Sequence, residues 1–183
     1  MWLNSLETRC WESRRLRAAR YVQPRPCTEM PVRNVKHILV PTDFAPASAE
    51  AVEWALELAA KFDAELTLLH TWEIPPYPYV DYVMSIIDLS GTLEKAASGA
   101  LATALENVRT RFPRVKSVLK LGLPWQEIVG AVQDLGVDLV VMGSHGRHGF
   151  DRVLMGSVAE KVVRLCSVPV LTVRSAPKNL GAP

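Results

Sequence analysis

Short apolar runs alternate along this chain with longer segments in which apolar residues recur at every third or fourth position. The runs are rich in Val, Ile and Leu and have the length of strands, whereas the longer segments have the spacing of one helix face. Strands that alternate with helices are typical of a parallel sheet joined by right-handed helical crossovers. The expected strands are 36–41, 65–71, 115–121, 137–142 and 168–174, and the expected helices are 47–62, 91–112, 124–135 and 155–166. The alternation therefore predicts an α/β fold, a single doubly wound domain with a five-stranded parallel sheet and four helices.

The two ends of the chain lack this alternation. Residues 1–29 contain six Arg and three Glu, and Pro24 and Pro26 would end any helix that begins before them. We expect residues 1–33 to form a poorly ordered, Arg-rich extension. An Arg-rich targeting presequence is the alternative, although such presequences avoid acidic residues. The domain is expected to span residues 34–174, and residues 175–183 are expected to be a flexible C-terminal tail.

Charge and cysteine content weigh against several classes of protein. The formal net charge is +2, and residues 1–29 carry +3, so residues 30–183 carry −1. A body this close to neutral lacks the basic surface on which nucleic-acid affinity depends. No apolar run approaches the roughly 18 residues of a membrane-spanning helix. Three cysteines are few and odd in number, which argues against a disulfide framework and favours a reducing, intracellular compartment.

The connection at residues 73–90 is long for a tight turn and contains three Pro and three Tyr. Long connections in compact domains are often functional lids. One interpretation is a flap over a ligand site, with Tyr77, Tyr79 or Tyr82 stacking on the ligand. The other is surface packing or contact with a second subunit, and the sequence favours neither.

Unusual sequences follow two of the expected strands. The first strand ends in Pro41-Thr42-Asp43, and the fourth runs into the segment GSHGRHG at residues 143–149. Ligands of open parallel sheets bind beyond the carboxyl ends of the strands, where the strand order reverses. These two segments are therefore the expected binding region.

The glycine-rich segment has the composition of an anion site. Gly143 and Gly146 allow backbone N–H groups to approach a ligand closely. Gly156-Ser157 lies where the last helix begins, and the N–H groups and dipole of a helix N-terminus suit phosphate, to which Arg147 adds a cation. Taken singly, the glycines could only turn the chain and Ser157 could only cap the helix. The joint spacing favours phosphate binding.

That spacing resembles the nucleotide-binding signature of the universal stress protein family. Gly143 is followed after two residues by Gly146, and after nine more by Gly156-Ser157. The sequence HILVPTDF at residues 37–44 is similar to the family's opening, and the resemblance covers residues 34–174. It implies strand order 3-2-1-4-5, an adenine-nucleotide alpha-hydrolase-like architecture, a cytoplasmic ATP-binding stress-response protein, and a homodimer that pairs strand 168–174 across a two-fold axis.

The resemblance also implies a set of nucleotide-binding positions. In ATP-binding members the residues after the first strand lie beside adenosine, the end of the second strand contacts adenine through its backbone, and the glycine-rich segment holds ribose and phosphates. The matching positions here are Pro41, Thr42, Asp43, Thr71, Met142, Gly143, Gly146, Arg147, Gly156, Ser157 and Val158. Thr71 stands where an aliphatic residue is common, a change that a backbone contact would survive.

Motifs of efficient phosphoryl transfer are missing from the sequence. It contains no GxxxxGK[ST], and no GxGxxG follows a strand. Asp43 could help to hold Mg²⁺ by way of the phosphates, but no general base is evident. We therefore expect ATP with Mg²⁺ to be bound with slow or absent hydrolysis, and no residue is assigned as catalytic. The alternatives are a slow ATPase or a phosphoryl or nucleotidyl transferase in the same site, and a structural dimer without ligand.

Three further side chains carry weaker signals. His145 and His148 have a spacing that would allow a shared metal ion, but no third Cys or His lies near them in the sequence, so we expect them to face solvent. Cys166 lies among apolar neighbours at the end of the last helix and is expected to pack there.

Overall fold

The computed structural model describes residues 34–74, 83–145 and 155–174, all of which belong to the unit formed by residues 34–183. The expected extension at 1–33, the tail at 175–183 and the three tyrosines of the long connection lie outside the described residues. The strands are β1 (His37–Pro41), β2 (Glu65–Trp72), β3 (Val115–Leu121), β4 (Leu139–Gly143) and β5 (Val170–Val173). The helices are α1 (Pro46–Phe62), α2 (Val83–Arg109), α3 (Pro124–Asp134) and α4 (Ser157–Leu165).

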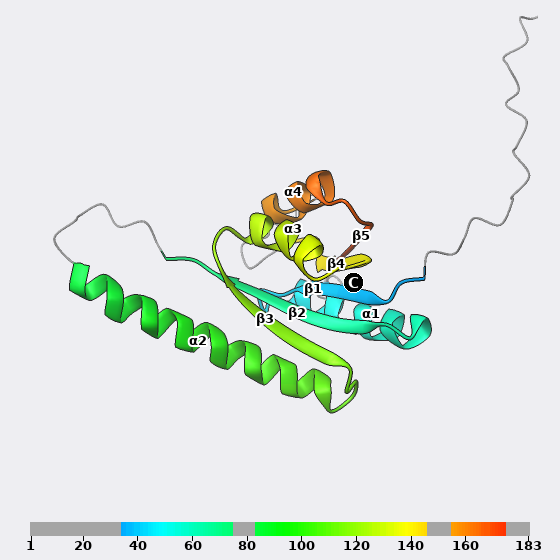
Figure 1. Ribbon diagram of the computed structural model, residues 1–183, viewed down its shortest axis with the longest axis horizontal. Helices are drawn as coiled ribbons and strands as arrows, with labels where there is room; N and C mark the ends of the chain where they lie inside the picture. Colours follow the sequence, from blue (N-terminus) through cyan, green and yellow to red (C-terminus); the bar gives the residue numbers. More distant parts are fainter. Residues whose placement is uncertain (1–33, 75–82, 146–154, 175–183) are drawn as a thin grey trace, which may run out of the picture. The chain divides into compact units, whose positions relative to one another are not determined.

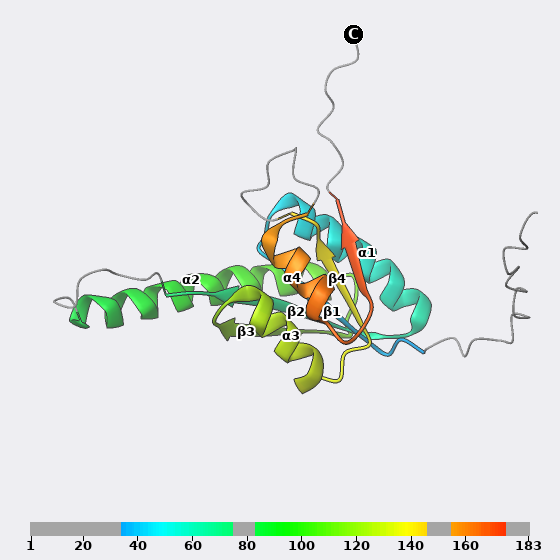
Figure 2. The same cartoon turned by 90° about the horizontal axis from the view of Figure 1, so that it is seen from above.

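The five strands form one sheet in the order β3-β2-β1-β4-β5, and every pair is parallel. The predicted fold class and strand order are confirmed. β1 lies in the middle, with Pro41 opposite Leu69 of β2 and Leu39 opposite Val140 of β4. From β1 the chain first adds β2 and β3 on one side and then β4 and β5 on the other. The order therefore reverses between β1 and β4, and Figure 2 shows β5, the red arrow, beside β4.

Helices cover both faces of the sheet (Figure 1). α1 and α2 pack on one face, where Ile38 and Val40 of β1 are fully buried against them. α3 and α4 pack on the other, around Leu39 of β1. Burial on both faces explains why the central strands β1 and β4 read as nearly continuous apolar runs rather than as alternating ones.

The start of α2 differs from the prediction. The helix begins at Val83, so residues 83–90 are helical and do not belong to a connection that was expected to span 73–90. All three prolines of that region, Pro75, Pro76 and Pro78, precede the helix, and the next one is Pro113. Every residue from Val83 onward therefore retains the backbone N–H that a helix needs. Gly91, which costs up to about 1 kcal/mol in a helix interior, does not end it.

The other boundaries fall within three residues of the predicted ones. α3 begins at Pro124 as its first helical residue, where the missing N–H of proline costs nothing. Among the described residues, no helix is long and apolar enough to cross a membrane.

Candidate functional site at the carboxyl ends of β1 and β4

Thr42 lies directly after β1 and all its polar groups are engaged. Its backbone N–H donates to the carbonyl of Leu69 at 2.8 Å, and its carbonyl lies 2.7 Å from Nδ1 of His70. Its hydroxyl accepts from the N–H of Phe44 at 3.1 Å and donates to Oγ of Ser48 at 3.3 Å. Two adjacent residues of β2 and the first turn of α1 thus fix the chain where it leaves the sheet.

Asp43 and Phe44 form the turn that follows. Oδ1 of Asp43 accepts a hydrogen bond from the N–H of Ala45 at 3.1 Å, the pattern of an Asx turn. Phe44 adopts a positive φ of 63°, and its ring lies 4.4 Å from that of His70, centroid to centroid. Ala45 then caps α1, which begins with Pro46.

Gly143, the last residue of β4, lies against the first turn of α1. A Cβ at this position would meet the carbonyl carbon of Ala47 at 2.9 Å and the backbone nitrogen of Ser48 at 3.0 Å. Because both are backbone atoms, only glycine fits there without displacement of the helix. The structure therefore places Gly143 beside the segment that holds Thr42, two candidates that lie a hundred residues apart in the sequence.

Backbone contacts also connect the end of β4 to the start of α4. The N–H of Gly156 donates to the carbonyl of Ser144 at 2.7 Å, and the N–H of Ser144 donates to the carbonyl of Val173 in β5 at 2.7 Å. Met142, one residue before Gly143, is buried in the core on the α3–α4 face. The two strand ends and the first turn of α4 thus meet along one edge of the sheet.

The N-cap of α4 is Gly156, with φ −73° and ψ 155°, and Ser157 is the first helical residue. The alternative in which Ser157 caps the helix is therefore wrong. A capping residue needs an extended backbone, which Gly156 has. Because Gly156 is a glycine, it has no side chain that would occupy the N–H groups of the first turn. Ser157 is exposed and Val158 half-buried, while Glu160 in the same turn is exposed.

Thr71 lies further along the same edge. It is the second-last residue of β2, half-buried and opposite Lys120 of β3. It follows Leu69, the partner of Pro41, by two residues, so it extends past the end of β1. A backbone contact between β2 and a ligand bound beyond the end of β1 would therefore have to come from the position of Thr71.

Gly146 and Arg147 lie outside the described residues, as does His148. Nδ1 of His145 lies 2.9 Å from Oγ of Ser144. Within residues 34–74, 83–145 and 155–174, no group of three or more His, Cys, Asp or Glu side chains is placed to hold a metal ion. Cys166 is half-buried at the end of α4 and packs against the core of the α3–α4 face.

Sequence reasoning missed Phe44, Ser48 and His70 as parts of this region. Ser48 is buried, and its hydroxyl donates to the carbonyl of Ala45 at 2.9 Å. His70 could have been noticed as an ionisable residue that directly follows the apolar pair Leu68-Leu69 in the strand sequence ELTLLHTW. Phe44 gave no signal, since only coordinates reveal a positive φ at a bulky residue.

Comparison with known proteins relates this fold to one protein family. The model of the Universal stress protein family matches residues 34–174. The chain is 32% identical to Universal stress protein MJ0531 of Methanocaldococcus jannaschii over 144 residues, which are 79% of this chain and 85% of that protein. The universal stress protein UspA from Lactobacillus plantarum superposes with a TM-score of 0.68 at 27% identity, covering 76% of this chain and 98% of that one.

Two more distant structures share the fold and contain a nucleotide. A universal stress protein in complex with cAMP has a TM-score of 0.59 at 22% identity and covers 78% of this chain and 99% of its own. A universal stress protein family protein from Arabidopsis thaliana with AMP bound has a TM-score of 0.56 at 19% identity and covers 80% and 96%. With its domain matched from end to end, the present chain belongs to the universal stress protein family.

Proposed function

We propose that this chain binds ATP beyond the carboxyl ends of β1 and β4 and acts as a nucleotide-responsive regulatory module in the response to stress. One observation carries the proposal. Gly143 lies against Ala47 and Ser48, and so brings the glycine-rich end of β4 to the Thr42–Asp43 turn. These segments meet where the strand order reverses, the usual ligand position in such sheets.

Each part of this edge suits a different part of a nucleotide. Asp43 offers a carboxylate that can accept hydrogen bonds from ribose hydroxyls, and the backbone of Thr71 is available for the base. The first turn of α4, capped by a residue without a side chain, suits the phosphates. Gly146 and Arg147 are assigned to the phosphates by the family resemblance alone. The complexes of related proteins with cAMP and AMP favour an adenine nucleotide as the ligand.

Mg²⁺ would enter with the phosphates rather than occupy a site of its own. Among the described residues no cluster of three metal-binding side chains exists, and the acidic residues of this edge are Asp43 after β1 and Glu160 in the first turn of α4. Mg²⁺ in proteins often keeps several waters and uses one or two carboxylates together with substrate phosphates. Asp43 would then be its protein ligand.

Two measurements test binding and separate it from catalysis. Equilibrium dialysis of nucleotide-free protein against labelled ATP should show one saturable site per chain, and absence of binding would favour a structural role without ligand. Steady-state release of ADP or AMP then reports turnover. A rate above about 1 s⁻¹, within the ordinary enzyme range, would contradict a regulatory module and favour an ATPase or transferase.

We also propose a cytoplasmic homodimer that pairs β5 across a two-fold axis. β5 hydrogen-bonds to β4 and lies at the margin of the described sheet, with Leu171 partly exposed. An apolar strand at a sheet margin offers unpaired backbone groups to a second copy. Native mass spectrometry of freshly purified protein would report both the number of chains and any nucleotide that co-purifies.

A further inference from the structure

We infer that His70 and Phe44 are positioning residues that hold the carboxylate of Asp43 toward the nucleotide. The inference rests on the proposed function, because it assigns a role within the proposed site. The two residues to which it gives a role, His70 and Phe44, belong neither to the phosphate-binding segment nor to the positions that the family resemblance assigns. Its basis is the strained turn after β1 and the contacts that maintain it.

The strain lies at Phe44. A φ of 63° places this bulky aromatic residue in the left-handed region, which side chains of its size rarely adopt. Such conformations persist where the surrounding structure enforces them, and they cluster at ligand sites. Here the strained residue, Phe44, directly follows Asp43, whose Oδ1 accepts a hydrogen bond from the N–H of Ala45 across the same turn.

His70 holds this turn from the neighbouring strand. Its Nδ1 lies 2.7 Å from the carbonyl oxygen of Thr42, and because a carbonyl can only accept, Nδ1 must carry the hydrogen. The preceding residue of β2, Leu69, accepts the N–H of Thr42 through its carbonyl. β2 therefore forms hydrogen bonds with both the N–H and the carbonyl of Thr42, the residue before Asp43.

The ring of His70 also supports Phe44. The two ring centroids lie 4.4 Å apart at an interplanar angle of 45°, a close contact at the short limit of the distances at which aromatic rings pair favourably. One imidazole thus fixes the residue before Asp43 through a hydrogen bond and the residue after it through ring contact. With the backbone held on both sides, Asp43 is oriented before the ligand arrives, which reduces the entropy lost on binding.

Two substitutions at His70 separate this role from general stability. His70→Leu removes the donor, whereas His70→Asn keeps an N–H group near the position of Nδ1. The probes are ATP and inorganic tripolyphosphate, both without Mg²⁺, since metal-free phosphates do not need Asp43. We expect His70→Leu to weaken ATP binding about tenfold, the effect of one lost, partly buried hydrogen bond, and to leave tripolyphosphate binding within about twofold of wild type. His70→Asn should retain most of the ATP affinity.

Phe44→Gly provides a second test should His70→Leu fail to fold. Glycine adopts the left-handed conformation without strain, which offsets part of the packing lost with the Phe44 ring, so the variant should fold while its ATP affinity falls more than its tripolyphosphate affinity. A residue that served stability alone would lower the melting temperature and leave both affinities unchanged. Wild-type ATP affinity in folded His70→Leu, or an equal loss for both probes, would overturn the inference. Failure of the wild-type protein itself to bind ATP would instead refute the proposed function, on which the inference depends.

Discussion

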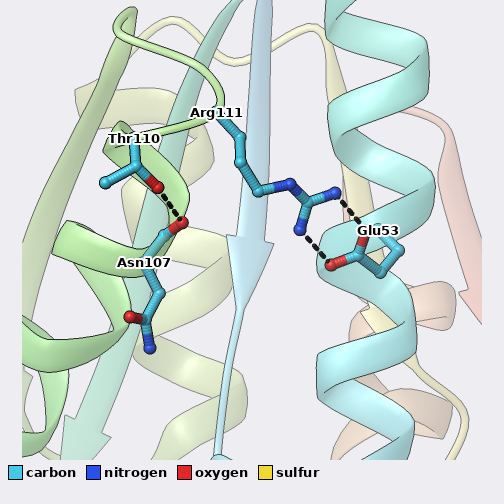
Figure 3. Close-up of polar contacts among 4 residues, drawn as sticks. All are labelled: Glu53, Asn107, Thr110 and Arg111. Atoms are coloured by element: carbon cyan, nitrogen blue, oxygen red, sulfur yellow. Dashed lines mark hydrogen bonds and ion pairs between the residues drawn. The ribbon is translucent and has the colours of Figure 1, made fainter.

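Arg111 donates two parallel hydrogen bonds to the carboxylate of Glu53, from Nη1 to Oε1 at 2.7 Å and from Nη2 to Oε2 at 2.6 Å (Figure 3). Glu53 lies in the middle of α1, and Arg111 lies just beyond the end of α2, next to Thr110, whose hydroxyl donates to the carbonyl of Asn107. The pair therefore ties together the two helices that cover one face of the sheet. The hydrogen bonds from the Arg111 guanidinium lower the pKa of the Glu53 carboxyl below its usual value.

This pair should make stability depend on pH in a defined direction. Because the pKa of Glu53 is lower in the folded than in the unfolded chain, its contribution is present above the unfolded pKa and is lost as pH falls through the folded pKa. Both side chains are largely exposed, so the contribution is small. The melting temperature of Glu53→Gln should lie slightly below that of wild type at about pH 7, and the difference should shrink as the pH falls below 4.5, the ordinary pKa of a glutamate.

Glu57→Gln is the matched control, because Glu57 is exposed one turn further along α1 and makes no ion pair with the described residues. Circular dichroism melts of both variants across the same pH series make the comparison. An equal pH profile for the two would assign the effect to the charge on α1 rather than to Arg111.

Gly143→Ala should destabilise the fold. The added Cβ would lie 2.9 Å from the carbonyl carbon of Ala47, and neither backbone can give way without moving α1 from the sheet. Overpacking of this kind costs about 1–3 kcal/mol in the free energy of unfolding. Urea denaturation followed by circular dichroism measures the loss. A variant as stable as wild type would show that α1 can shift freely at this contact.

Gly99→Ala should have the opposite effect. Gly99 lies within α2, where an added Cβ meets nothing within 4 Å. Alanine in such a position removes the entropic cost of glycine and raises the free energy of unfolding by about 0.5–1 kcal/mol. The same urea titration therefore distinguishes a glycine required by close packing from one that is merely tolerated.

The sheet could be predicted from the sequence because the apolar patterns of its strands and helices are local and repeat along the chain. Strands buried on both faces must be apolar throughout, and each crossover helix must present an apolar stripe, so the alternation identifies both. Thr42, Asp43 and Gly143 could be assigned to one edge because the carboxyl ends of parallel strands share an edge. The strand order came from resemblance, since periodicity does not say which strands are neighbours.

Boundaries and supporting contacts could not be predicted in the same way. The helix that begins at Val83 was placed eight residues too late, because Ser90-Gly91 has the low helix propensity of a boundary while its neighbours outweigh it. The contacts of His70 depend on the register between β1 and β2, which brings it beside Thr42. Neither residue type nor spacing within one strand contains that information.

Leu171→Arg should weaken the proposed homodimer. Leu171 is a partly exposed residue of the marginal strand β5, and two copies of an arginine near a two-fold axis would repel each other. Sedimentation velocity should show wild type as a dimer at micromolar concentration and the variant shifted toward monomer. Lys116→Glu on β3, the opposite margin of the sheet, is the control and should leave the oligomeric state unchanged. A wild-type protein that sediments as a monomer would contradict the dimer itself.

Gly156→Val tests the phosphate end of the proposed site. The backbone of Gly156, at φ −73° and ψ 155°, lies in the extended region that any residue adopts, so these angles allow valine, with a cost of about 1 kcal/mol for the poorer N-cap. Its branched side chain would stand beside the N–H groups of the first turn of α4, where the phosphates are proposed to bind. We expect ATP affinity to fall by at least about a hundredfold, with loss of several charge-assisted hydrogen bonds, while the circular dichroism spectrum is retained. Gly156→Ala, with a smaller side chain at the same backbone angles, should lie between valine and wild type. Unchanged ATP affinity in the valine variant would mean that the first turn of α4 does not contact the phosphates, and a ligand would then have to bind elsewhere along the edge.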